Sequence, residues 1–127
     1  MPRAKVTFET AREIAMGLPG AEEGLTYGAA ALKVNGKLMA CIPTNKQAEP
    51  DSLMVRTSFD RRDELLEHAP DVYYAPPHYQ PYPCVLIRLK RIDREALADL
   101  LAAAYRFVKT EPRVKSRGRA AKKRAGL

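Results

Sequence analysis

The sequence is short of the residues that mark a disulfide scaffold, a membrane protein or a secreted protein. It has no tryptophan and only two cysteines, Cys41 and Cys84, which are far apart and belong to no CxxC motif. No apolar run approaches the roughly 20 residues of a membrane-spanning helix, and the first residues lack the charged, apolar and small-residue pattern of a signal peptide. We therefore expect a cytoplasmic protein without a membrane partner, whose two thiols are reduced and packed in its interior.

Recognisable catalytic and cofactor motifs are also missing. The sequence has no glycine-rich phosphate loop, and its two histidines, His68 and His78, have no further ligands at metal-binding spacing. A thiol nucleophile needs a nearby base, and His78 is the candidate for Cys84, but nothing in the sequence orients the pair. We therefore expect a protein that is not an enzyme, with no catalytic residues, no metal, no cofactor and no small-molecule substrate.

The net charge of +7 is unevenly distributed along the chain. Eight of the 22 basic residues and one of the 15 acidic residues lie from Lys109 onward, so residues 1–108 hold fourteen of each and are neutral overall. A chain of 127 residues has the length of a single domain. We predict one folded domain over residues 1–108 and a basic tail over 109–127, which lacks apolar periodicity and is expected to be disordered in isolation.

Apolar periodicity and helix caps predict the order of the elements. Thr7 is a suitable N-cap for a first helix that stops at Leu18-Pro19-Gly20, and Asp93 for a long last helix that ends near Lys109. Strands that follow one another through hairpins favour an antiparallel sheet with helices packed on one face, an α+β fold of order α-β-β-β-α-β-(β)-α. The other predicted segments are a polar connector at 21–28, a hairpin at 29–34 and 37–42, a strand at 52–58, a helix capped by Asp60, a short extended piece at 72–75 and a strand at 84–90.

The Asn35-Gly36 hairpin allows two registers that aim its lysines differently. A two-residue loop of type I′, which the Asn-Gly dipeptide favours, pairs Val34 with Lys37 and places Lys33 and Lys37 on opposite faces. A three-residue loop with a left-handed Gly36 pairs Lys33 with Lys37 on one face and leaves the other face wholly apolar. We predict the three-residue loop, because it sorts apolar from charged side chains more completely.

Cationic side chains then gather on the face of the sheet that the helices do not cover. No acidic residue lies in any predicted strand, so this face is a candidate surface for phosphates, although basic residues at strand edges also serve to discourage edge pairing. Tyrosines interleaved with prolines in 70–83 are suited to stacking on exposed bases or to pinning the loop on the core. The candidate nucleic-acid-binding residues are Lys33, Lys37, Arg56, Arg88 and Lys90 on the sheet, and Arg113, Lys115, Arg117, Arg119, Lys122, Lys123 and Arg124 in the tail.

Three blocks of the sequence together resemble the MmcQ/YjbR family over about residues 6–108. The blocks are LPGAEEGLTYGAAALKVNGKLMA, HAPDVYYAPPHYQPYPCVLIRL and IDREALADLLAAAYRFV. The sequence departs from the family's usual pattern at Cys84 and near Leu32, where aromatic residues are expected. The resemblance implies a CyaY-like fold, with a curved antiparallel sheet and helices on one side, and the family is commonly described as DNA-binding by analogy with hairpin wings. Iron binding, known in the related frataxin-like branch, is not expected, because its acidic ridge is reduced here to Glu9, Glu13, Glu22 and Glu23.

We therefore expect a small protein that binds nucleic acid, most simply duplex DNA, without sequence preference. The cationic sheet face and the basic tail would both contact phosphates, so affinity should fall steeply with salt. The alternative is a protein-interaction adaptor that docks a partner on the sheet face or on the Pro-Tyr loop at 72–83. The sequence sets neither the oligomeric state nor the choice between DNA and RNA.

Overall fold

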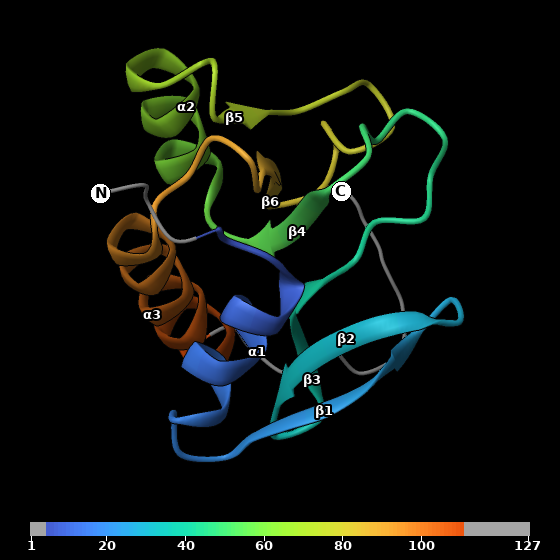
Figure 1. Ribbon diagram of the computed structural model, residues 1–127, viewed down its shortest axis with the longest axis vertical. Helices are drawn as coiled ribbons and strands as arrows, with labels where there is room; N and C mark the ends of the chain where they lie inside the picture. The colour runs from blue at the N-terminus through green and yellow to red at the C-terminus, as the bar shows by residue number, and fades with distance from the viewer. Residues whose placement is uncertain (1–4, 111–127) are drawn as a thin grey trace.

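Within the described residues, six strands pair into an antiparallel sheet, and three helices complete the fold (Figure 1). The structure is a computed structural model and describes residues 5–110. The strands lie side by side in the order β1-β2-β3-β4-β6-β5, so the predicted α+β class is confirmed. The elements are α1 (Phe8–Met16), β1 (Ala21–Thr26), β2 (Ala29–Val34), β3 (Lys37–Cys41), β4 (Ser52–Arg56), α2 (Phe59–His68), β5 (Tyr73–Tyr74), β6 (Cys84–Arg88) and α3 (Arg94–Thr110).

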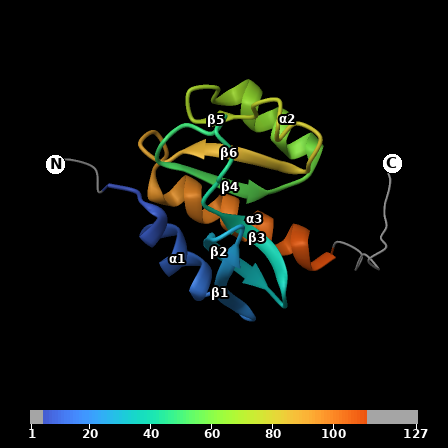
Figure 2. The same ribbon diagram turned by 90° about the vertical axis from the view of Figure 1, so that its right-hand side faces the viewer.

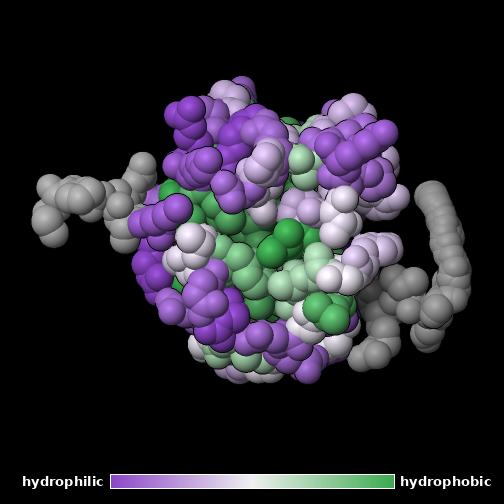
Figure 3. Space-filling model, turned by 45° about the vertical axis from the view of Figure 1, so that its right-hand side comes forward, coloured by the Kyte–Doolittle hydropathy of each residue, from purple (hydrophilic) through white to green (hydrophobic). Residues whose placement is uncertain are grey.

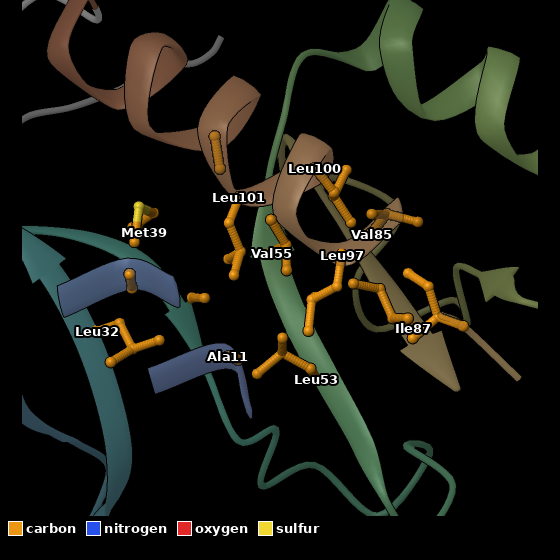
Figure 4. Close-up of a cluster of buried hydrophobic side chains, with 14 of the residues drawn as sticks. Ala11, Leu32, Met39, Leu53, Val55, Val85, Ile87, Leu97, Leu100 and Leu101 are labelled. Carbon is orange, nitrogen blue, oxygen red and sulfur yellow. The ribbon is translucent and has the colours of Figure 1, made fainter. Parts of the chain in front are cut away.

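The main core lies between the helices and one face of the sheet. Leu97, Leu100 and Leu101 of α3 point toward Leu53 and Val55 of β4 (Figure 4), and all five side chains are buried. Apolar residues at helical spacing in α3 and at alternate positions in β4 place these side chains on facing surfaces. Burial of side chains of this size stabilises the fold by about 1.5–3 kcal/mol each, so this layer fixes the sheet against α3.

A smaller apolar cluster occupies the opposite face of the sheet, which none of the helices within residues 5–110 covers. Its buried members come from four strands, and two connections, 42–51 and 75–83, lie over part of it. Figure 2 looks at the molecule from this side, with the segment that follows β3 crossing in front of β4 and β6. We call this face the open face. The buried members of the cluster are Ala31, Cys41, Met54, Cys84 and Leu86.

Two of the predicted helix caps are confirmed and one is wrong. Thr7 is the N-cap of α1, and the Asp93 carboxylate accepts a hydrogen bond from the backbone N–H of Ala96 at 2.7 Å. The cap of α2 is Ser58, whose hydroxyl accepts from the N–H of Arg61 at 3.1 Å, rather than Asp60, which lies in the first turn. Either side chain suits a cap, and the extended backbone of Ser58 decides between them.

Residues 21–26 form strand β1 at one edge of the sheet, so the prediction of a polar connector over 21–28 is wrong. Ala21 pairs with Val34 at one end of the β1–β2 hairpin and Thr26 with Ala29 at the other. Two acidic residues and a glycine hid the strand, because an edge strand needs less apolar surface than a central one. At the other edge, the two-residue β5 confirms the short extended piece expected at 72–75.

The β2–β3 hairpin has the two-residue loop, and the predicted three-residue register is wrong. Val34 pairs with Lys37, and both turn residues, Asn35 and Gly36, have positive φ as in a type I′ turn. The three-residue register was favoured because it separates apolar from charged side chains. In the structure a β-bulge produces this separation instead. Lys33 pairs with Leu38 but Leu32 pairs with Ala40, so Met39 is the extra residue, and both Met39 and Ala40 are buried in the main core.

None of the helices within residues 5–110 is long and apolar enough to cross a membrane.

Candidate binding groove

A groove of about 710 Å³ lies on the open face of the sheet. It runs between the β1–β2 turn, the segment that follows β3 and the proline-rich loop that precedes β6, three parts of the chain that are distant in sequence. Figure 3 shows this side of the molecule, with hydrophobic side chains gathered in the hollow at its centre and hydrophilic ones above and below. The volume is in the range of small-molecule and cofactor pockets, so the groove is large enough to hold a ligand group.

Exposed apolar side chains stand at the rim of the groove. Tyr27 is 91% exposed, Tyr82 54% and Ile42 37%, although all three line the groove. Tyr27 occupies the first position of the β1–β2 turn, with a φ of 51°, and Gly28 follows with a φ of 78°. Backbone of this kind favours Asn, Asp and Gly over an aromatic residue, so Tyr27 is held in an unfavourable conformation and packs on little in return.

The opposite wall of the groove is a small aromatic cluster in the proline-rich loop. The rings of His78 and Tyr79 meet edge to face with centroids 4.9 Å apart, and the ring of Tyr82 lies 6.3 Å from that of His78. Side chains and backbone from the preceding loop hold the cluster in place, since the N–H of Asn45 donates to the Tyr79 hydroxyl at 3.4 Å and the N–H of His78 to the Gln47 amide oxygen at 2.8 Å. These hydrogen bonds hold the loop against the preceding one over the sheet, which confirms the prediction that its tyrosines fix the loop on the core.

Arg62 of α2 anchors the same loop from behind. It is buried, and its guanidinium donates to the carbonyl oxygens of Tyr82 at 3.0 Å, Gln80 at 3.1 Å and Cys84 at 3.2 Å. Its charge lies over the ring of Phe59, 4.9 Å from the centroid. Burying a charge costs free energy unless its donors are satisfied, and here backbone carbonyls accept from Nη1 and Nη2, while Nε has no partner within the described residues. Nothing in the sequence marked this arginine as different from its neighbours.

The floor of the groove is apolar and contains both thiols, which are free and buried. Burial, together with the nearby Cys84, raises the pKa of Cys41 to about 11, and burial also raises the pKa of Cys84. The Cys84 thiol donates to the carbonyl of Tyr79 at 3.9 Å. A reactive thiol has a lowered pKa, so the surroundings of these cysteines favour the protonated, inert form. His78 and Cys84 do line the same groove.

Arg56 is the one lysine or arginine among the described residues that lines this groove. Its Nε donates to the carbonyl of Pro83 at 3.2 Å, and its guanidinium lies 5.5 Å from the ring centroid of Phe107 on α3. The sequence placed Arg56 on the open face by strand alternation, and the structure agrees. Because the contacts with Pro83 and Phe107 orient the side chain, a positive charge is fixed beside an apolar, aromatic surface.

The other predicted cations of the sheet do not gather around Arg56. Lys37 lies on the helix-covered side, where its ammonium donates to the carbonyl of Val108 at 3.3 Å, near the end of α3. Lys33 lies on the open face, with its aliphatic stem packed over Gly24 of the edge strand β1. The prediction that both lysines point from one face is therefore wrong, because the two-residue turn separates them.

Two further predicted cations, Arg88 and Lys90, form ion pairs with acidic residues in the loop before β4. Arg88 forms two hydrogen bonds of 2.8 Å with the carboxylate of Glu49, which hold the pKa of Glu49 below its ordinary range, and it also stacks 4.4 Å from the ring of Tyr74. Lys90 lies 3.4 Å from Asp51. The absence of acids from the predicted strands was therefore misleading, because the neighbouring loop and β1 supply them. A continuous cationic sheet face does not form within residues 5–110.

The acidic residues near the first helix are engaged in ion pairs and hydrogen bonds. Glu9 and Glu23 both pair with Arg12, and the hydrogen bonds from Arg12 lower the pKa of Glu9. Glu22 accepts from the N–H of Gly36 at 3.2 Å. In the part of the chain that the structure describes, no three His, Cys, Asp or Glu residues lie close enough to hold a metal ion. The predicted tail residues Arg113, Lys115, Arg117, Arg119, Lys122, Lys123 and Arg124 lie outside the described residues.

The fold and the groove define an α+β protein with a six-stranded sheet, whose open face carries an aromatic-rimmed hollow. The family model for YjbR matches residues 16–107, most of the chain, and the chain belongs to the YjbR family. Its fold is similar to that of the Deinococcus radiodurans protein DR2400, described as a DUF419 domain, with a TM-score of 0.69. The two chains are 21% identical over 88% of this chain and 85% of that one. No curated protein matches the sequence.

Proposed function

We propose that this protein binds nucleic acid without sequence preference, using its open face together with the basic residues that follow α3. The proposal is supported mainly by the position of the end of α3, where the excess of basic residues in the sequence begins. The structure describes α3 as far as Thr110, and the last turns of the helix lie against both Lys37 and Arg56, through Val108 and Phe107. The seven basic residues of 113–124 therefore follow directly from a point beside the groove.

Charge supports this choice of partner. Residues 1–108 are neutral overall, so the surplus of +7 belongs to residues 109–127. A run of basic residues is an electrostatic footprint of nucleic-acid binding, in which lysines and arginines replace the counterions of the phosphates. Arg56 extends this positive region onto the open face, and Lys37 lies near the end of α3 on the helix-covered side. Arg88 and Lys90 are paired with carboxylates, so we assign them no phosphate contact.

The salt dependence of affinity tests the proposal. Fluorescence anisotropy with a labelled oligonucleotide, at about 50 and about 200 mM salt, gives the slope of log affinity against log salt, which is up to about 0.9 for each phosphate neutralised. Replacing Arg113, Lys115, Arg117, Arg119, Lys122, Lys123 and Arg124 with glutamine in the full chain should flatten this slope. The matched control replaces Arg61, Arg91 and Arg94, which are exposed cations elsewhere on the domain, and should leave the slope unchanged. Absence of binding by the unaltered chain at low salt would contradict the function.

The apolar lining of the groove favours a second candidate, a protein-interaction adaptor. Most of the lining is aliphatic, aromatic or sulfur-containing, with Arg56 as its basic residue, and such a surface also suits an apolar peptide with an acidic group. An adaptor predicts a protein partner that is retained after nuclease treatment and whose binding depends little on salt. A partner that is lost when nucleic acid is digested would argue against it.

A further inference from the structure

We infer that the groove on the open face receives an unpaired nucleobase, so that the ligand class is single-stranded rather than duplex nucleic acid. This inference rests on the proposed function and goes beyond it, because contact with phosphates alone does not distinguish single strands from duplexes. In a duplex the faces of the bases are hidden by their neighbours in the stack, and a base can enter a pocket only after it is unpaired. A groove built to hold a base therefore selects for strands whose bases are already exposed.

Tyr27 provides the first argument. A large aromatic ring that is 91% exposed contributes little to folding, and the left-handed backbone at this turn, with a φ of 51°, favours asparagine or glycine. Residues held in unfavourable backbone conformations concentrate at functional sites. The ring stands at the rim of the groove, where a flat ligand can stack on it. Neither packing nor turn formation explains the tyrosine, whereas stacking does.

The opposite side of the groove presents further rings. Tyr82 is 54% exposed, and it lies in the cluster with His78 and Tyr79 that Arg62 and the 42–51 connection hold in place. Proteins that bind single strands combine such aromatic platforms with a positively charged path for the backbone. Because these rings are fixed before the ligand arrives, little conformational freedom is lost when a base stacks on them.

Charge complementarity gives the third argument. The floor of the groove, which includes Cys41 and Met54, is buried and apolar, as the face of a base requires. Arg56 is oriented at the same groove by Pro83 and Phe107, and arginine suits phosphate recognition because its guanidinium matches phosphate oxygens. A nucleotide unit has both parts, a flat ring and an attached phosphate. A peptide side chain seldom combines them.

Binding to matched single-stranded and duplex oligonucleotides tests the inference with the full-length chain. Each oligonucleotide carries one fluorescent 2-aminopurine, whose emission is quenched when it stacks on an aromatic ring. We expect the protein to bind the single strand more tightly than the duplex and to quench its fluorescence. Tyr27→Asn, which suits the turn, should weaken single-strand binding by roughly 5- to 150-fold, the range for loss of one stacking ring, and should remove most of the quenching. Tyr82→Leu should act in the same direction.

The matched control is Leu25→Thr, which alters an exposed side chain of the same hairpin that does not line the groove. It should leave both affinity and quenching unchanged. Equal affinity for the two oligonucleotides, unaltered by Tyr27→Asn and Tyr82→Leu, would overturn the inference and leave the proposed function standing. No binding to either oligonucleotide would overturn both. Loss of oligonucleotide binding when an apolar acidic peptide occupies the groove, with no quenching at any stage, would assign the groove to a protein partner and contradict the inference.

Discussion

The guanidinium of Arg62 donates through Nη1 to the carbonyl oxygen of Tyr82 at 3.0 Å, which ties the middle of α2 to the wall of the binding groove. The same group also bonds the carbonyls of Gln80 and Cys84. Its Nε is buried without a hydrogen-bond partner. The arginine therefore connects the stability of the domain to the shape of the groove, and substitutions at this position should affect both.

Arg62→Met should destabilise the domain by about 3 kcal/mol, because it leaves several buried carbonyl oxygens without donors. Urea unfolding followed by circular dichroism gives the free energy of unfolding. The loop 75–83 should also become susceptible to proteolysis under native conditions, before global unfolding. Arg61→Met, at the exposed neighbouring position, is the control and should change stability by less than about 0.5 kcal/mol. Equal stability of the two variants would show that the carbonyl contacts do not hold the loop.

The β1–β2 turn should become more stable when its aromatic residue is removed. Tyr27→Asn places a residue that tolerates positive φ where the turn needs one, so we expect stability to stay the same or rise by up to about 1 kcal/mol. Gly28→Ala is the opposite test. No atom lies within 4 Å of an added Cβ at Gly28, but its φ of 78° strains alanine, and a loss of about 1 kcal/mol is expected. A marked loss of stability in Tyr27→Asn would mean that the ring packs in the fold and would weaken the stacking argument.

Stability should decline at alkaline pH through the Cys41 thiol. Its pKa rises from an ordinary value of 9.0 to about 11 in the folded state, mainly through burial. Above pH 9 the unfolded chain releases this proton while the folded chain retains it. The contribution of the protonated thiol to the free energy of unfolding is therefore present below pH 9 and is lost as the pH rises toward 11. The urea midpoint of the wild type should therefore fall over this interval, and more steeply than that of Cys41→Ala. Parallel curves for the two proteins would contradict the burial of a protonated thiol.

The two thiols should resist modification and should not form an intramolecular disulfide. Strands β3 and β6, which carry them, are separated by β4, so their backbones are roughly 9–10 Å apart, and a disulfide requires Cα atoms within about 7 Å. Reaction with a thiol reagent at neutral pH should be slow in the native protein and rapid in urea, because the thiolate is the reactive form. Mass spectrometry of the oxidised native protein should find no internal disulfide. Rapid native modification of Cys84 would indicate an activated thiol.

Periodic apolar patterns predicted the elements that have a buried face. The stripe of α3 and the alternation in β4 and β6 follow from repeated burial, so both were identified with the correct faces. Strand β1 was missed because Glu22, Glu23 and Gly24 give it no apolar pattern. Its position depends on β2, to which it pairs, and the Tyr27-Gly28 dipeptide was the local sign of a turn that would have shown it.

The groove could be predicted only in part. Tyrosines and prolines in 70–83 indicated an ordered loop with stacking potential, and strand alternation placed Arg56 on the open face. The two-residue turn directs Lys37 to the helix-covered side, and the bulge at Met39 then buries both Met39 and Ala40 in the main core. Pairing of Arg88 with Glu49 and anchoring by Arg62 bring together residues that are distant in sequence. Contacts of this kind have no local sequence pattern. Strand alternation therefore predicted a cationic face, whereas in the structure the charge of Arg88 is paired with a carboxylate.

Mapping the bound strand by NMR tests the central claim most directly. In a titration of the uniformly labelled full-length protein with a single-stranded oligonucleotide, amide shifts should change at Tyr27, Ile42, Arg56 and Tyr82, around the groove. Amides on the outer faces of α1 and α2 should remain unchanged. If the shift changes within residues 5–110 fall on those helices, or if none occur there while binding is otherwise evident, the open face does not contact nucleic acid and the account is contradicted.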